Sequence, residues 1–200
     1  ATGRKSEALN ANKTAVKLSP QDPEAHNNLG NTLKELGRLD EAEASYNQAL
    51  VLKPDYAEAH CNLGIVLHHS GKLDKAEASY RQAIALKSEF PEAYSNLGIT
   101  LQEAGKLKEA DASYNQAIEL SPGYAEAHSN LGNMLKELGR LEEAEASYNQ
   151  AIALDPNLAE AHNNLGTTLQ ELGRLEEAKA RWTQALLLKP NFFDGVRNLV

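Results

Sequence analysis

Apolar residues recur at helical spacing along this chain, and the pattern restarts every 34 residues. Within one period, Leu29, Leu33 and Leu36 are spaced i, i+4 and i+7, which places them on one face of a helix. A second amphipathic stretch follows over residues 39–52. Each period therefore predicts two helices. A unit of this size is too small to bury its own apolar face, so neighbouring units must stack.

Glycine and proline mark the ends of the predicted helices. Gly37 follows the first helix and can adopt a positive φ, as a helix C-terminal stop requires. The same glycine recurs as Gly71, Gly105, Gly139 and Gly173, and a basic residue follows each, near the negative end of the first helix dipole. The second helix is closed by Pro54, Pro122, Pro156 and Pro190. Each repeat therefore reads as helix, tight turn, helix and short loop.

The 34-residue period runs through the whole chain, which predicts one continuous stack of repeats. Five complete repeats cover residues 23–56, 57–90, 91–124, 125–158 and 159–192. Residues 1–22 match the second half of a repeat, with a helix expected near residues 5–18, and residues 193–200 match the start of a sixth. Nothing in the composition indicates a linker or a second domain.

A second glycine column lies inside the first helix of each repeat, at Gly30, Gly64, Gly98, Gly132 and Gly166. Glycine there costs about 1 kcal/mol relative to alanine. Its repetition predicts a close approach between helices, where a Cβ atom would clash. The large residue expected to fill the gap is Tyr46, Tyr80, Tyr114, Tyr148 or Trp182.

The columns Leu29–Gly30, Gly37, Ala42, Tyr46, Ala49 and Pro54 resemble the signature of the tetratricopeptide repeat family. The resemblance covers the whole chain and implies an all-α fold, an α-solenoid of antiparallel helix pairs wound as a right-handed superhelix. In that architecture the first helices line the inner groove. The chain departs from the family at an early aromatic column, which reads His26, His60, Tyr94, His128, His162 and Val196.

Charge and cysteine content narrow the function classes. The net charge is −8 and the 20 basic residues are scattered, which argues against nucleic acid as a partner. The single cysteine, Cys61, excludes an internal disulfide framework. No apolar run reaches membrane-spanning length and no signal peptide opens the chain, so we expect no membrane contact and a cytoplasmic location. The chain begins and ends within a repeat, which is typical of a fragment.

One column carries the main functional hypothesis. The residue before each Leu-Gly, or before the equivalent leucine near the end, is Asn28, Asn62, Asn96, Asn130, Asn164 or Asn198. Asparagine is a poor choice for helix stability. Its amide, however, matches the N–H and C=O groups of one peptide unit. Packed helices lie about 8–10 Å apart, a distance that an extended peptide covers in roughly three residues. A row of amides in the groove could therefore hold a peptide backbone.

This row resembles the asparagine ladder in the superhelical repeats of O-GlcNAc transferases, which bind extended segments of protein substrates. The amino-acid sequence of the repeats is also similar to that of bacterial members of the family. The resemblance nominates the six asparagines as peptide-binding residues and implies nothing catalytic in this chain. The alternative is that asparagine in this column serves only local hydrogen bonding.

Other groove chemistries fit less well. Family members that bind the C-terminal carboxylate of chaperones use Lys and Arg in inner columns, and none stands there in the complete repeats. An acidic column, comprising Glu24, Glu58, Glu92, Glu126, Glu160 and Asp194, would instead favour cationic groups on a ligand, or it only complements the helix dipole. The related pentatricopeptide repeats, which bind RNA, are usually one residue longer and have a basic groove.

Candidate catalytic and metal-binding residues have simpler explanations. The histidines of the aromatic column are expected to pack with one ring nitrogen satisfied. His68, His69 and Cys61 lack zinc-motif spacing. The column Ser45, Ser79, Ser113 and Ser147 is expected at the solvated surface of the second helices. No nucleophile elbow, phosphate loop or HExxH motif is present. We therefore expect no enzymatic activity, cofactor or metal.

The sequence predicts a protein–protein interaction scaffold that binds an extended peptide or partner segment. Two alternatives remain open. The chain could be the substrate-recruiting arm of a larger enzyme such as a glycosyltransferase. It could also be a self-assembling structural protein, because helices at the ends of a repeat stack expose apolar faces that head-to-tail association would cover.

Overall fold

Every regular element in the described part of the chain is an α-helix. The computed structural model describes residues 2–190. Its helices are α1 (Thr2–Leu18), α2 (Pro23–Glu35), α3 (Leu39–Leu52), α4 (Ala57–His69), α5 (Leu73–Leu86), α6 (Pro91–Glu103), α7 (Leu107–Leu120), α8 (Ala125–Glu137), α9 (Leu141–Leu154), α10 (Ala159–Glu171) and α11 (Leu175–Leu188). The expected all-α fold is confirmed. The first helix begins at Thr2, earlier than the expected start near residue 5.

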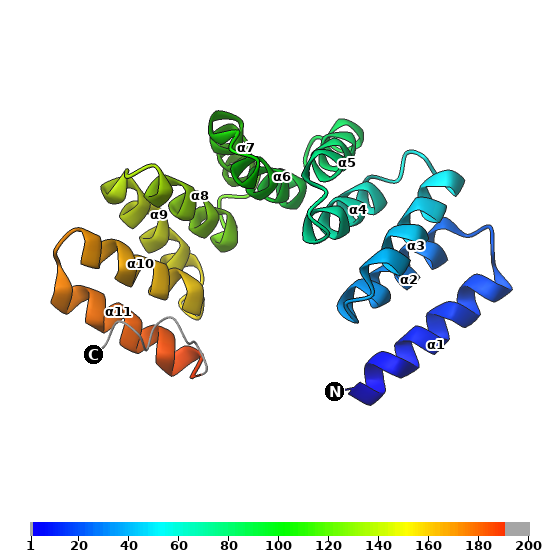
Figure 1. Cartoon of the computed structure of the whole chain (residues 1–200), viewed down its shortest axis with the longest axis horizontal. Helices are drawn as coiled ribbons and strands as arrows, with labels where there is room; N and C mark the ends of the chain where they lie inside the picture. The colour runs from blue at the N-terminus through cyan, green and yellow to red at the C-terminus, as the bar shows by residue number, and fades with distance from the viewer. Residues whose placement is uncertain (1, 191–200) are drawn as a thin grey trace. The chain divides into compact units, whose positions relative to one another are not determined.

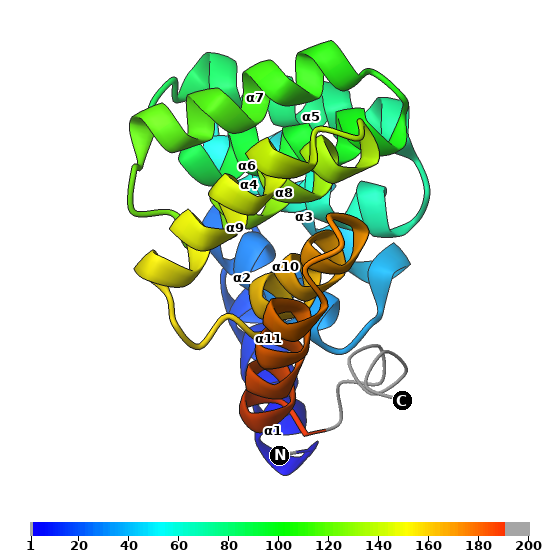
Figure 2. The same ribbon diagram turned by 90° about the vertical axis from the view of Figure 1, so that its left-hand side faces the viewer.

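The helices belong to two compact units, residues 1–106 and 107–200, each considered by itself. In the first unit, each of the helices α1 to α6 packs on the next along the chain, as Figure 1 shows. In the second unit, α7 to α11 do the same, and Figures 1 and 2 both show α10 beside α11. The first helices of successive repeats also touch, α4 with α2 and α6, and α8 with α10. This contact between first helices is what brings repeated residues together.

The turn within each repeat is built as the glycine column predicts. Gly37 has a φ of 72°, a left-handed conformation that favours glycine. The Gly37 N–H donates to the Lys34 carbonyl at 2.9 Å, and the Arg38 N–H donates to the Leu33 carbonyl at 2.9 Å. These bonds satisfy carbonyls left open at the end of α2. The other four glycines of the column have φ between 71° and 78°.

In four repeats the core is an aromatic ring set against a helical glycine. The Tyr46 side chain is completely buried, and a Cβ atom added to Gly30 would lie 2.6 Å from its ring. The corresponding distance is 2.7 Å between Gly64 and Tyr80 and 2.5 Å between Gly166 and Trp182. The predicted close approach is confirmed at these positions. Leu33 is buried at 2% exposure, whereas Leu29 and Leu36 on the same predicted face are half-buried.

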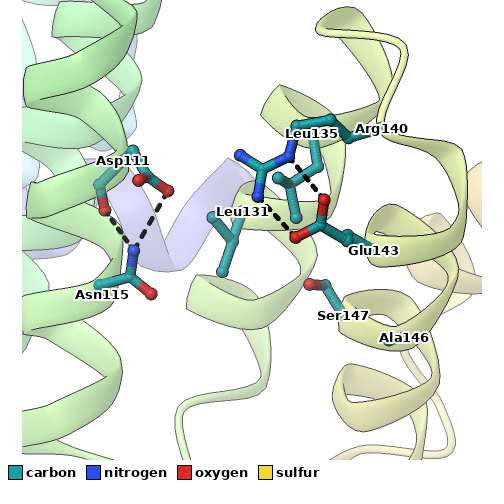
Figure 3. Close-up of a pocket in the computed structure, with 8 residues that line it drawn as sticks. All are labelled: Asp111, Asn115, Leu131, Leu135, Arg140, Glu143, Ala146 and Ser147. Atoms are coloured by element: carbon teal, nitrogen blue, oxygen red, sulfur yellow. Dashed lines mark hydrogen bonds and ion pairs between the residues drawn. The ribbon is translucent and has the colours of Figure 1, made fainter.

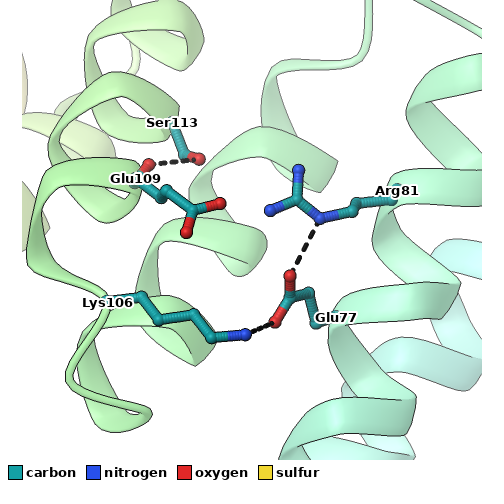
Figure 4. A network of polar contacts seen from close by, with 5 residues as sticks. All are labelled: Glu77, Arg81, Lys106, Glu109 and Ser113. Atoms are coloured by element: carbon teal, nitrogen blue, oxygen red, sulfur yellow. Dashed lines mark hydrogen bonds and ion pairs between the residues drawn. The ribbon is translucent and has the colours of Figure 1, made fainter.

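Three of the basic residues that follow the turns also join one repeat to the previous one. Lys72 Nζ lies 2.8 Å from Glu43 Oε2, and Arg174 Nη1 lies 2.7 Å from Glu145 Oε2. Lys106 Nζ lies 2.7 Å from Glu77 Oε2, and Figure 4 shows that Glu77 also accepts from Arg81. The hydrogen bond from Lys106 lowers the pKa of Glu77. The column therefore ties successive second helices together, beyond the dipole role that the sequence suggests.

The serine column does not lie at a solvated surface. Ser45, Ser79 and Ser113 are buried, with exposures of 9%, 9% and 8%, and Ser147 is half-buried. The Ser45 hydroxyl donates to the Glu41 carbonyl at 2.9 Å, and the Ser113 hydroxyl donates to the Glu109 carbonyl at 2.8 Å (Figure 4). Because each of these two hydroxyls bonds to its own helix, it can be buried without needing water. The expectation of solvated serines was wrong for the three buried members.

Candidate functional site

The asparagine column lies on the first helices with its side chains open to solvent. Asn28 is exposed on α2. The half-buried members are Asn62 on α4, Asn96 on α6, Asn130 on α8 and Asn164 on α10. Asn198 lies outside the described residues. A half-buried amide is anchored by the protein and can still be reached by a ligand.

Two of these amides bond across to the first helix of the preceding repeat. Asn62 Nδ2 donates to Asn27 Oδ1 at 3.1 Å, which links α4 to α2. Asn164 Nδ2 donates to Asn133 Oδ1 at 2.8 Å, which links α10 to α8. The column therefore contributes to the joints between repeats, which the sequence did not predict. Asn27 and Asn133, which accept these bonds, lie outside the predicted column.

The Asn96 amide faces a thiol. Cys61 on α4 is 4% exposed, and its thiol is in hydrogen-bond contact with the Asn96 side chain. Burial raises the pKa of the Cys61 thiol to about 11, and the contact with Asn96 opposes this rise. At neutral pH the thiol is therefore protonated and inert as a nucleophile.

The amides retain hydrogen-bonding capacity after these contacts. An asparagine side chain offers two N–H donors and two lone pairs on its oxygen. Within the described residues, Asn62 uses one N–H, whereas Asn164 uses one N–H and accepts one bond from Asn163 Nδ2 at 3.3 Å. The Asn28 side chain makes no hydrogen bond to the described part of the chain. Each of these amides therefore keeps at least one donor and one acceptor for a ligand.

The tyrosines of the core extend their hydroxyls toward the same surface. Tyr46 Oη donates to Asn31 Oδ1 at 2.8 Å, and Tyr148 Oη donates to Asn133 Oδ1 at 2.8 Å. Asn133 accepts from both Tyr148 and Asn164, so its oxygen connects the core of one repeat to the amide of the next. Burial raises the pKa of Tyr46 and of Tyr148, so both are neutral hydroxyl donors.

The histidines in the aromatic column have the expected single hydrogen bond. Their Nε2 atoms contact the carbonyl of the proline six residues earlier, at 3.0 Å for His26, 2.9 Å for His60, 3.2 Å for His128 and 3.1 Å for His162. His162 is 4% exposed, and burial lowers its pKa. These side chains fasten the first helix to the preceding loop, which is a structural role.

Two members of the acidic column have lysine partners within their own repeat. Glu58 Oε1 lies 3.1 Å from Lys87 Nζ, and Glu160 Oε1 lies 3.2 Å from Lys189 Nζ. Both carboxylates are about half exposed. A cationic ligand would compete with these lysines, so the acidic column is a weaker candidate than the amides.

The His68–His69 pair does not assemble with Cys61. His68 Nε2 lies 3.1 Å from Glu103 Oε2, and His69 Nδ1 lies 2.8 Å from the Ile65 carbonyl. Within residues 2–190, no three His, Cys, Asp or Glu side chains gather in a way that could hold a metal ion.

A separate pocket of about 360 Å³ opens between α7, α8 and α9 (Figure 3). Its floor includes Leu131 and Leu135. On one wall Asp111 accepts from Asn115 Nδ2 at 3.1 Å, and on the other Arg140 makes paired bonds of 2.7 and 2.5 Å to Glu143. The pocket lies where the cross-repeat ion pair is missing, since among the described residues Arg140 bonds only to Glu143.

Paired helices, a glycine–aromatic core and contacting first helices define the chain as an all-α repeat protein. A family model described as TPR repeat matches residues 1–37, 30–71, 66–105, 100–139 and 132–173. A second, described as Tetratricopeptide repeat, matches residues 159–192. The chain belongs to the tetratricopeptide repeat family. Its members are in general non-catalytic scaffolds for protein–protein interaction.

Solved structures with the same fold include several proteins of this family. The chain is similar to YrrB, described as a TPR protein with an unusual peptide-binding site, with 25% identity and a TM-score of 0.67 over 95% of this chain and 98% of YrrB. It is similar to TTC0263, a thermophilic TPR protein of Thermus thermophilus, with 28% identity and a TM-score of 0.75 over 88% and 96% of the two chains.

A third structure shows the fold alone. The Cut9–Hcn1 hetero-tetramer of the APC/C matches with 20% identity and a TM-score of 0.88, over 99% of this chain and 39% of the other. No curated protein matches the chain in sequence. No helix in the described residues combines the length and apolar character needed to cross a membrane.

Proposed function

We propose that the chain is a scaffold without catalytic activity that holds an extended segment of a partner protein against its first helices. The row Asn28, Asn62, Asn96, Asn130, Asn164 and Asn198 grips the backbone of that segment. The observation that carries the proposal is the anchoring of Asn62 and Asn164: each is tied to the neighbouring first helix and keeps a free donor and acceptor.

Anchoring matters because an amide that is already held loses little side-chain entropy when it binds. A mobile side chain costs about 0.5–1.5 kcal/mol to immobilise at an interface. The similarity to YrrB, whose description names a peptide-binding site, supports a peptide as the ligand class. Hydrogen bonds to the backbone depend little on the side chains of the bound segment, so we expect modest affinity and broad specificity.

A matched pair of double variants tests the row. Asn62→Ala with Asn96→Ala removes two inner amides. Asn47→Ala with Asn149→Ala removes two exposed amides on the second helices, where neither side chain makes a hydrogen bond to the described residues. The probe is a display library of random peptides about twelve residues long, which spans about four repeats. Peptides recovered with the wild-type chain are labelled and titrated by fluorescence anisotropy.

The inner variant should weaken binding at least about tenfold, and the outer variant should leave binding unchanged. Each lost hydrogen bond is worth about 0.5–1.5 kcal/mol, and about 1.4 kcal/mol corresponds to tenfold. The inner variant also loses the bond to Asn27, so its Tm should fall slightly, and binding is measured well below that Tm. Equal affinity of all three chains would refute the amide row.

Two alternative functions, a recruiting arm of a larger enzyme and a self-assembling structural protein, have their own tests. A recruiting arm would use the same groove, and the full open reading frame would show a catalytic domain joined to it. Self-assembly predicts that the mass measured by light scattering rises with concentration. A mass that stays at one chain over the whole concentration range would exclude it.

A further inference from the structure

The amide row is not uniform, because the position beside it changes character along the chain. Three residues after each asparagine of the row stand Asn31, Ile65, Ile99, Asn133 and Thr167. Asn31 and Asn133 accept from the tyrosine hydroxyls Tyr46 and Tyr148. Ile65 and Ile99 offer no acceptor. They lie half-buried on α4 and α6, which contact each other.

Register places these isoleucines beside the amides. Asn164 bonds to Asn133, which stands three residues after the column asparagine of the preceding repeat. Ile65 holds the same position relative to Asn96. Asn96 faces the Cys61 thiol, which stands 35 residues earlier, as Asn27 does relative to Asn62. Helices in contact lie about 8–10 Å apart, so Ile65 and Ile99 form neighbouring apolar spots along the row.

The Tyr80 hydroxyl is the second sign of an unfilled site. Tyr80 is 2% exposed, and its hydroxyl makes no hydrogen bond to the described residues, because Ile65 replaces the asparagine that serves Tyr46 and Tyr148. Trp182 Nε1 is fully buried and has no hydrogen-bond partner in the described part of the chain. The Tyr80 hydroxyl, by contrast, is not fully buried. Part of the hydroxyl is therefore open to solvent. Because the described residues offer this hydroxyl no acceptor, an acceptor on the ligand would bond to it without displacing a protein group.

We infer that α4 and α6 form a subsite that accepts an apolar side chain of the bound segment against Ile65 and Ile99, while the Tyr80 hydroxyl donates to a backbone carbonyl of that segment. This inference rests on the proposed function and gives it sequence preference. The ligand class is an extended segment with a leucine- or isoleucine-like residue at this subsite. Elsewhere the row remains indifferent to side chains.

Two host peptides of about nine residues test the subsite, a length that spans about three repeats. Both alternate serine and threonine, and they carry leucine or serine at the centre. The variant Ile65→Asn with Ile99→Asn installs residues that the chain itself carries at Asn31 and Asn133, so it retains the fold. Tyr80→Phe removes only the hydroxyl, and Tyr148→Phe is its matched control, in which a hydroxyl with a partner is lost.

The wild-type chain should bind the leucine peptide about fivefold more tightly than the serine peptide, as expected for one half-buried apolar side chain. The isoleucine variant should lose that preference, and its affinity for the serine peptide should also fall, because an asparagine at position 65 would accept from the Tyr80 hydroxyl as Asn31 accepts from Tyr46. Tyr80→Phe should weaken both peptides about fivefold without lowering the Tm, whereas Tyr148→Phe should lower the Tm.

The outcomes separate the two proposals. Binding of both peptides without preference, or a preference that survives in the isoleucine variant, would overturn the subsite while leaving the amide row in place. Unchanged affinity in Tyr80→Phe would overturn the role of the hydroxyl. Binding that is insensitive to Asn62→Ala with Asn96→Ala, or no binding of either peptide, would overturn the proposed function and the subsite with it.

Discussion

The identity of several residues in this chain is explained by their contacts with residues on another helix. Gly64 is the clearest case. It lies in the middle of α4, where glycine is intrinsically unfavourable, yet an added Cβ atom would lie 2.7 Å from the Tyr80 ring. The ring is enclosed and cannot move aside. The same pairing of glycine and ring recurs at Gly30, Gly132 and Gly166, so it is a general feature of the repeat core.

Gly64→Ala should therefore lower the free energy of unfolding by about 1–2 kcal/mol, because overpacking outweighs the helix-propensity gain. Gly123→Ala is the control. No atom lies within 4 Å of a Cβ built there, and Gly123 has no positive φ. That change should be neutral or stabilising by up to about 1 kcal/mol. Urea unfolding of both variants measures the difference, and a Gly64→Ala chain as stable as the wild type would contradict the packing.

The glycine and asparagine columns show how far sequence reasoning reaches. The gap at Gly30 was predictable, because a repeated cost within a helix requires a compensating neighbour, and the tyrosine column was the large residue available. The bond from Asn62 to Asn27 was not, because the partner stands 35 residues earlier and depends on how two helices face each other. The buried state of Ser45 was missed for a related reason. A polar residue on a helix reads as solvated unless the bond to its own backbone is considered.

At the scale of helices, second helices are joined by ion pairs between an acid and a base 29 residues apart. Glu43 with Lys72, Glu77 with Lys106, and Glu145 with Arg174 form this pair. Asp111 and Arg140 have the same separation, but the shorter Asp111 side chain bonds to Asn115 instead. A pocket is open at that joint (Figure 3). The Asp111 side chain is one methylene group shorter than the glutamates at the other joints, and this difference explains the open joint between α7 and α9.

Asp111→Glu should restore the ion pair with Arg140 and narrow the pocket. The measurement is a double-mutant cycle with Arg140→Gln, read from thermal unfolding. Positions 111 and 140 should show weak coupling in the wild-type background, where only the attraction between the two charges acts, and stronger favourable coupling once Glu stands at 111. The coupling should weaken with added salt because both groups are exposed.

Glu145→Asp is the reverse control, since it should weaken the coupling between positions 145 and 174. If coupling to Arg140 is the same with Asp and with Glu at 111, side-chain length does not explain the open joint.

At the scale of the whole chain, the 34-residue period places the same residue at the equivalent position of each repeat. One side chain thus becomes a series of equivalent side chains. A single asparagine on a helix has little functional meaning. In the proposed function, the asparagines of this column would offer a series of donors and acceptors at about the spacing that an extended peptide presents. Neither the net charge of −8 nor the unbroken repeat pattern indicates another kind of binding site. Ile65, Ile99 and Tyr80 interrupt the uniformity and would supply the preference that the amides lack.

Side-chain amide NMR during a peptide titration tests the central claim most directly. The chain is labelled with ¹⁵N, and the amide signals are assigned by single asparagine-to-alanine variants. A peptide recovered from the random library is then added. The Nδ2 signals of Asn62, Asn96 and Asn164 should shift and saturate at one common affinity, whereas those of Asn47 and Asn149 should stay in place. Peptide binding that leaves the inner amide signals unmoved, or shifts only the outer ones, would contradict the account.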